Sequence, residues 1–101
     1  MYIGKVKLNN EWSKLEDLIQ NQIEGQSAFS FSEGTTYQLQ AEGNYGVRLC
    51  DSSTTPAEAQ DGERIEGTQT AIYEVSDGYL YVRPEENIPS GNVWLKISSL
   101  G

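Results

Sequence analysis

Apolar and polar residues alternate along most of the chain with the two-residue period of β-strands. In Tyr79–Arg83, Leu80 and Val82 share one face, and Val93–Ile97 repeats the same arrangement. A half-buried strand places successive side chains on opposite faces of a sheet, which produces this period. On the same ground, further strands are predicted at Tyr2–Leu8, Ala28–Ser32, Thr35–Ala41, Gly46–Cys50 and Gln69–Val75.

One segment near the N-terminus follows the helical period instead. Asn9 and Asn10 precede it as candidate N-caps, and Gly25 follows it as a stop. We therefore predict a helix over about residues 11–23 that covers one open face or end of the sheet. The apolar stripe of this helix consists of Trp12, Leu15, Leu18, Ile19 and Ile23.

Polar turns separate the predicted strands. The segments 35–40 and 46–50 are predicted to be partner strands, and Asp77–Gly78 is typical of a hairpin turn leading into Tyr79–Arg83. The polar stretch Asp51–Gly62 is long for a loop in a small domain. We predict a mainly β fold: a small antiparallel β-sandwich, jelly-roll or Ig-like, of about seven short strands with one N-terminal helix. Residues 1–101 are predicted to be a single domain.

The charge balance narrows the classes of partner. Seven Lys and Arg residues against fifteen Asp and Glu residues give a formal net charge of -8. Such a surface repels the phosphate backbone of nucleic acids and anionic lipid surfaces. No apolar run approaches the ~20 residues of a membrane helix, and the N-terminus has no apolar signal region. We expect neither a nucleic acid nor a membrane as partner.

The chain carries no recognisable pattern for catalysis, metal binding or cofactor binding. With no His and one Cys, it offers neither a zinc ligand set nor an activating base for Cys50. No glycine-rich phosphate motif is present, and no pair of carboxylates is marked out for acid–base work. The acidic residues on or beside the long loop match no EF-hand spacing. We predict a non-enzymatic protein with no catalytic residue, no metal and no cofactor.

Four residues on the predicted outer faces of the last strands are the candidate binding residues. If the aliphatic faces form the core, then Tyr79, Tyr81, Arg83 and Trp94 lie on the outside. Exposed aromatic residues with Arg are typical of protein interfaces, and aromatic rings can also stack on sugars. The alternative is that the predicted helix or the long loop covers them.

The middle of the chain has a characteristic order of strand edges and turns, carried by Tyr37–Gln40, Gly43, Val47–Cys50, Pro56, Asp61–Glu63 and Gly78–Arg83. This order resembles that of small accessory virion proteins of tailed bacteriophages and prophages, including head-fibre and capsid-decoration-like β-domains. The upstream segment Trp12–Ile19 is also similar to such proteins. The chain lacks the collagen-like or coiled-coil stalk that many fibres carry.

This resemblance implies a structural protein that is made in the bacterial cytoplasm and is located in the virion. Such proteins are β-sandwich modules that often form trimers, so we expect a homo-oligomer (trimer or dimer) that docks on a capsid or tail protein. A different class of function is a carbohydrate-binding module that recognises host-surface glycans through the exposed aromatics. A third hypothesis is a host-directed inhibitor whose acidic surface mimics nucleic acid.

Overall fold

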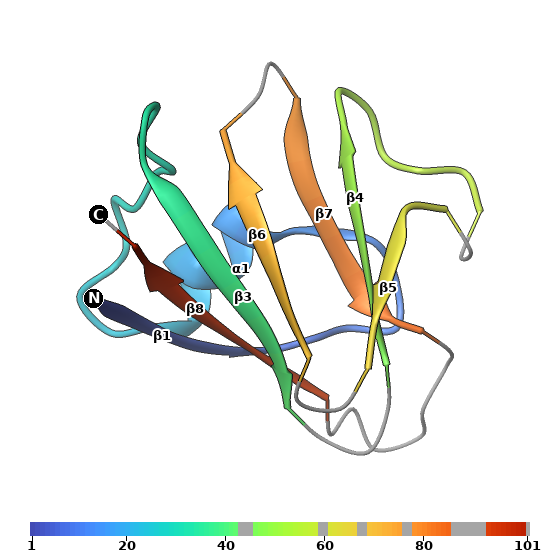
Figure 1. Cartoon of the computed structure of the whole chain (residues 1–101), viewed down its shortest axis with the longest axis horizontal. Coiled ribbons are helices and arrows are strands. Elements are labelled where there is room, and N and C mark those ends of the chain that lie inside the picture. Colours follow the sequence, from blue (N-terminus) through green and yellow to red (C-terminus); the bar gives the residue numbers. More distant parts are fainter. Residues whose placement is uncertain (43–45, 59–60, 67–68, 76–77, 86–92, 101) are drawn as a thin grey trace.

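The computed structural model describes residues 1–42, 46–58, 61–66, 69–75, 78–85 and 93–100, which form two antiparallel sheets and one helix. Sheet A contains, in spatial order, β1 (Tyr2–Lys7), β8 (Trp94–Ser99), β3 (Thr36–Glu42) and β6 (Thr70–Glu74). Sheet B contains β2 (Ser13–Lys14), β7 (Tyr79–Pro84), β4 (Val47–Ser52) and β5 (Glu63–Ile65) (Figure 1). The predicted class, a mainly β sandwich with one helix, is confirmed.

The pairing of the strands is that of a jelly roll. The first strand pairs with the eighth, the second with the seventh, the third with the sixth and the fourth with the fifth. This nested pairing arises when one long antiparallel ribbon is rolled so that its successive pairs fall alternately in two sheets. An Ig-like domain has a different order, with strands A, B, E and D in one sheet and C, F and G in the other. Of the two arrangements that the sequence left open, the structure has the jelly-roll order.

The alternating pattern builds the core between the two sheets. In β3, Tyr37, Leu39 and Ala41 are buried, whereas Gln38 and Gln40 between them are partly exposed. Burying one large aliphatic side chain contributes about 1.5–3 kcal/mol, so this face decides how the strand is oriented. The largest aliphatic side chains that are almost completely buried are Val6, Leu8, Leu15, Ile19, Leu39, Val47, Val82, Val93, Leu95 and Ile97.

The helix is shorter than the sequence predicted. Helix α1 spans Leu15–Gln22, because Ser13 and Lys14 pair with β7 as the short edge strand β2. The N-cap is Lys14, which makes no side-chain capping bond, so the predicted Asn caps are not used. The central part of the predicted stripe is nevertheless correct, since Leu15, Leu18 and Ile19 are buried. In the part of the chain that the structure describes, no helix is both long and apolar enough to cross a membrane.

Helix α1 covers the side of the sandwich where the sheets end in β1 and β2. It contacts β1, β2 and β7, and it lies behind the strands in Figure 1. Gly4 leaves the space that Ile23, just after the helix, occupies; a Cβ on Gly4 would lie 2.6 Å from the Ile23 Cδ1 atom. The Gln22 side-chain amide accepts the Lys7 N–H (2.8 Å) and donates to the Lys7 carbonyl (2.9 Å).

Two predictions about local strand pairing are wrong. Strands β3 and β4 lie in different sheets, and so do β6 and β7, so neither pair forms a hairpin. Ser76 and Asp77 of the predicted hairpin turn lie outside the described residues. The segment 28–32 alternates in sequence but is not a strand, and the structure adds β2 and β5, which were not predicted. The physical reason is that a turn signal specifies where the chain reverses, whereas the packing of two sheets decides which sheet the next strand joins.

Candidate functional site

The structure does not bring the four candidate binding residues onto one exposed surface. Tyr79 is 47% exposed at the start of β7, whereas Tyr81 and Arg83 further along the same strand are 5% and 8% exposed. Trp94 is half-buried and belongs to β8, which is in the other sheet. A shared platform of Tyr79, Tyr81 and Trp94 is therefore not present.

Trp12 lies near Arg83 of sheet B and is bonded to the long loop. The Trp12 ring centroid lies 6.0 Å from the Arg83 guanidinium carbon, and Trp12 Nε1 donates to the Glu58 carbonyl at 2.9 Å. The same Glu58 carbonyl accepts the Asp61 N–H (3.2 Å), which closes a turn within the loop. The alternative stated from the sequence was that the predicted helix or the loop covers these residues; the structure places Trp12, from the segment predicted as helix, near Arg83.

Cys50 on β4 shows that the loop folds back toward the sheet. Burial raises the pKa of the Cys50 thiol, and the nearby carboxylates of Asp61 and Asp51 raise it further. Strand β4 places this half-buried residue beside Tyr81 of β7. A thiol with a raised pKa holds its proton at neutral pH, so it is a poor nucleophile.

Trp94 lies on the outer face of sheet A among charged side chains. The ammonium nitrogen of Lys5 is 4.9 Å from the Trp94 ring centroid. The Glu42 carboxylate lies 3.5 Å from Lys5 Nζ and 3.4 Å from Lys96 Nζ, so one acid bridges two bases. Lys7 stands opposite Trp94 in the strand register. This surface, which we call the tryptophan face (Lys5, Lys7, Glu42, Trp94 and Lys96), holds three of the seven cationic side chains of the chain.

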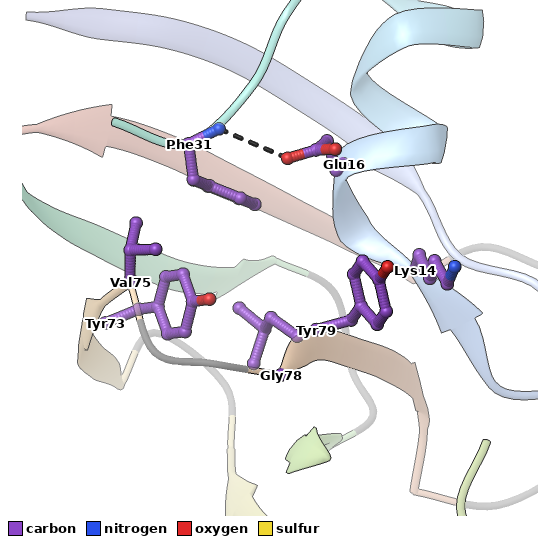
Figure 2. A pocket seen from close by; sticks show the side chains of 8 residues that line it. Lys14, Glu16, Phe31, Tyr73, Val75, Gly78 and Tyr79 are labelled. Atoms are coloured by element: carbon purple, nitrogen blue, oxygen red, sulfur yellow. Dashed lines mark hydrogen bonds between the residues drawn. The ribbon is translucent and has the colours of Figure 1, made fainter. Parts of the chain in front are cut away.

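Tyr79, the first residue of β7, forms the rim of a cleft (Figure 2). The Lys14 ammonium nitrogen lies 3.8 Å from the Tyr79 ring centroid, a cation–π contact that orients the ring. The cavity has a volume of about 110 Å³. We call this feature the aromatic cleft; it is lined by Lys14, Glu16, Phe31, Tyr73, Val75, Gly78, Tyr79 and Leu80.

Edge-to-face contacts between aromatic rings build the wall of the aromatic cleft. The Phe31 ring lies 5.1 Å from Tyr73 and 4.9 Å from Tyr37, with interplanar angles of 72° and 79°. Phe29 continues the cluster at 5.1 Å from Phe31. Perpendicular pairs at these distances are each worth about 0.5–1.5 kcal/mol beyond the area they bury, so the wall is a rigid feature.

Helix α1 holds the segment that carries Phe31. The Glu16 carboxylate in the first turn accepts the Phe31 N–H at 3.2 Å, as the dashed line in Figure 2 shows. One turn later, Gln20 donates to the Phe29 carbonyl at 2.7 Å. The Tyr37 hydroxyl accepts the next backbone N–H along the chain, that of Ser32, at 2.8 Å. An irregular segment is thereby fixed by side chains from a helix and a strand.

The sequence pointed to Tyr79 but gave no sign of the other cleft residues. Phe31 and Tyr73 stood in separate predicted strands, and Lys14 in the predicted helix. Only the rolled topology brings these positions together. The chemistry of the cleft is apolar, with one carboxylate and one ammonium group at its edge, and it therefore suits binding of an apolar group. Among the residues that the structure describes, no three Cys, Asp or Glu side chains gather to hold a metal ion.

Comparison of the chain with protein families, with characterised proteins and with solved structures finds no match in any of the three.

Proposed function

We propose that this chain is a non-enzymatic accessory protein of a bacteriophage or prophage virion, a jelly-roll module that docks on a capsid or tail protein through its aromatic cleft. It would be made in the bacterial cytoplasm and carried on the particle. The proposal joins the resemblance described above, carried by Tyr37–Gln40 and Gly78–Arg83, to a cleft whose walls include Tyr79.

The size of the aromatic cleft is the observation that carries the proposal. Pockets for small molecules have volumes of about 300–1,000 Å³. At about 110 Å³, this cavity suits one large apolar side chain. Protein interfaces commonly concentrate their binding energy in a buried anchor residue that fills such a pocket, often one lined by aromatic residues. An apolar anchor from a partner protein therefore fits the cleft better than a metabolite does.

The fold and the charge are compatible with a virion component. Jelly rolls occur among viral capsid and lectin domains, although a fold alone does not determine a function. A net charge of -8 on 101 residues opposes non-specific association between copies. A component that folds in the host and assembles by specific docking benefits from that repulsion.

The test is incorporation into particles of the phage or induced prophage that encodes the chain. We expect the protein to co-sediment with purified particles in a density gradient. Tyr79→Ala removes the rim of the cleft at an exposed position, so it should lower the amount per particle at least tenfold while the protein remains folded. Trp94→Ala, in the other sheet, is the matched control and should be incorporated normally. A chain that is absent from particles would contradict the virion role, and normal incorporation of Tyr79→Ala would contradict docking through the cleft.

Carbohydrate binding is a second candidate, and the tryptophan face is the observation that favours it. A half-buried indole surrounded by Lys5, Lys96 and Glu42 offers a ring for stacking beside donors and acceptors for sugar hydroxyls. Titration of host-surface glycans would give binding that disappears in Trp94→Ala and persists in Tyr79→Ala. Each variant is thus the control for the other: Tyr79→Ala should affect only particle incorporation, and Trp94→Ala only glycan binding. A variant that loses both would be unfolded.

A further inference from the structure

Among the described strands, none pairs with the outer edge of β6, which has a defined set of backbone groups. β6 pairs with β3 on one side and is the last strand of sheet A. Across that pair, the Ala41 N–H donates to the Gln69 carbonyl at 3.3 Å. Because hydrogen-bonded positions alternate in an antiparallel pair, Ala71 and Tyr73 also turn their backbone groups toward β3. The N–H and C=O groups of the intervening residues (Thr70, Ile72 and Glu74) therefore face outward.

An independent hydrogen bond on β3 gives the same assignment of inward-facing and outward-facing backbone groups. The Leu100 N–H donates to the Thr36 carbonyl at 2.8 Å, so Thr36 turns its backbone groups toward β8. By the same alternation, Tyr37, Leu39 and Ala41 turn theirs toward β6. Their partners in the register are Tyr73, Ala71 and Gln69, in agreement with the bond between Ala41 and Gln69.

The side chains on this edge do not protect it. Natural proteins block strand edges with charges, prolines, bulges or a covering element. In β6 the central residue is Ile72, which is 59% exposed, one of the few large hydrophobic residues on the surface. Its neighbours Thr70 and Ala71 are uncharged, and Glu74 is the single charged residue of the strand.

Beside β6 the sandwich is open. A cavity of about 220 Å³ lies between β6 and the strands of sheet B, and its lining includes the core residues Leu39, Leu49 and Leu80. Ile72 and Glu74 also line it. Within the described ranges, no helix covers this side, in contrast to the side that α1 closes.

We propose that two copies of the chain pair through β6 around a twofold axis at Ile72, which joins the two A sheets into one continuous sheet. In this register Ile72 faces Ile72 of the second copy, and Thr70 faces Glu74. The Thr70–Glu74 pair occurs twice, once on each side of the axis. Its residues and Ile72 have outward-facing backbone groups, so each pair can exchange two N–H···O=C bonds. The inference gives the homo-oligomer expected from the sequence a defined interface and a size of two chains. It does not depend on docking through the aromatic cleft, and its tests in solution need no particle.

The charge pattern of β6 fits a second copy of the same chain in this register. Centring the pairing on Ile72 uses all five residues of the strand and places no carboxylate opposite another. Centring it on Glu74 would bring two carboxylates face to face, which is destabilising. Because each chain has one β6 edge and the twofold uses both, pairing through β6 closes at two chains.

The acidic surface makes the pairing dependent on salt. Asp51 and Glu63 line the same open side as Glu74, and in the dimer they approach their counterparts. Salt screens such repulsion, since the screening length falls from about 10 Å at 0.1 M to about 3 Å at 1 M. The dimer should therefore become tighter as NaCl is raised, the opposite of an interface that is held by ion pairs.

Sedimentation over a concentration series tests the pairing, with proline variants as the sharpest probe. A dimer at high concentration is expected for the unaltered chain. Ile72→Pro removes an N–H that faces outward, so the fold should survive while the dimer is lost. Ala71→Pro removes an N–H that faces β3 and should instead disrupt the fold. Ile72→Lys keeps the backbone intact, places two like charges at the twofold axis and should also give monomers.

Disulfide trapping tests the register in the same molecule. In a Cys50→Ser background, Ile72→Cys places two Cα atoms about 5.5 Å apart across the twofold, within disulfide range. Gln38→Cys is the control, since Gln38 lies opposite Ile72 on β3, one strand further from the axis. We expect a crosslinked dimer from the first variant and none from the second. A strict monomer, a trimer, a dimer that persists in both Ile72→Pro and Ile72→Lys, or equal crosslinking by both cysteines would overturn the inference.

Discussion

The two long sides of the sandwich are built differently, although each is bounded by one edge of sheet A and one edge of sheet B. On the side of β1 and β2, helix α1 covers the core and the Gln22 amide bonds both backbone groups of Lys7. On the side of β6 and β5, core residues line an open cavity, and Ile72 is exposed. The chain thus closes one side with its own residues and leaves the other able to accept a strand.

The difference also separates the residues that stabilise the monomer from those that are available for assembly. The net charge of -8 opposes contact between copies, so pairing through the open edge depends on salt and on protein concentration. Residues on the closed side should therefore determine the free energy of unfolding. Residues on the open side should affect association more than folding.

The largest expected effect on the free energy of unfolding comes from truncating Leu15, the buried first residue of α1 on the closed side. Leu15 is 0% exposed, so Leu15→Ala should lower the free energy of unfolding by about 2–5 kcal/mol. Ile72→Ala on the open side should change it by less than about 0.5 kcal/mol, because a surface truncation leaves no cavity. Urea denaturation of dilute protein measures both, and similar losses in the two variants would contradict the comparison.

A glycine beside β5 provides the next largest effect. Gly62 has φ 83°, and a Cβ there would overlap the Leu49 carbonyl oxygen of β4. Gly62→Ala should cost about 2–4 kcal/mol, from the left-handed backbone together with the overlap. Gly34 is the matched control, since its φ is 85° and a Cβ would meet no atom within 4 Å. Gly34→Ala should cost only the backbone part, about 1–2 kcal/mol.

If Gly62→Ala and Gly34→Ala lowered the free energy of unfolding by the same amount, β4 would have to move to make room for the added methyl group. The measurement is again the urea midpoint, supported by hydrogen exchange of the β5 amides. In Gly62→Ala, the loss of exchange protection should be concentrated in β5, the short edge strand of the open side.

Residues with a clear short period were placed well by the sequence, and residues in short or crossing segments were not. The alternation in Thr35–Ala41 and Tyr79–Arg83 predicted β3 and β7 almost to the residue. The strand β2 has only two residues, Ser13 and Lys14, too few to show any period. Trp12 fits the helical stripe by spacing but packs instead near Arg83, because the chain enters β2 immediately after it.

The candidate site was less predictable than the fold, for a topological reason. Alternation correctly assigned Leu80 and Val82, but not Tyr81, to the hydrophobic core, but it cannot tell whether an outer face is covered. Trp12 lies far from both Glu58 and Arg83 in sequence, and nothing local signals that it contacts them. The aromatic cleft likewise depends on Phe31 and Tyr73 meeting across the roll.

The bonds from Gln22 to the β1 edge should have a moderate effect. Gln22→Ala removes two hydrogen bonds to Lys7, each worth about 0.5–1.5 kcal/mol, so a loss of about 1–2 kcal/mol is expected. Asn21→Ala, an exposed neighbour on the same helix, is the control and should have little effect. Light scattering of the Gln22 variant should also show additional self-association, because a second strand edge becomes available. An unchanged urea midpoint would show that water replaces the amide at no cost.

The smallest expected effect comes from the ion pairs on the outer face of sheet A, which join β1, β8 and β3 but not β6. Burial raises the pKa of Glu42, but Lys5 and Lys96 outweigh it and hold that pKa below its usual value. A carboxyl group with a lowered pKa in the folded state stabilises the protein above its unfolded pKa, and this contribution is lost as the pH falls through the folded value. Glu42→Gln should therefore lower the urea midpoint slightly at pH 7, and the difference from the unaltered chain should shrink below about pH 4.5. Glu74→Gln on β6 changes the net charge equally at a side chain that forms no ion pair with a described residue, and it should not lower the midpoint at pH 7. If both variants lowered it equally, net charge rather than the Lys5–Glu42–Lys96 arrangement would account for the effect.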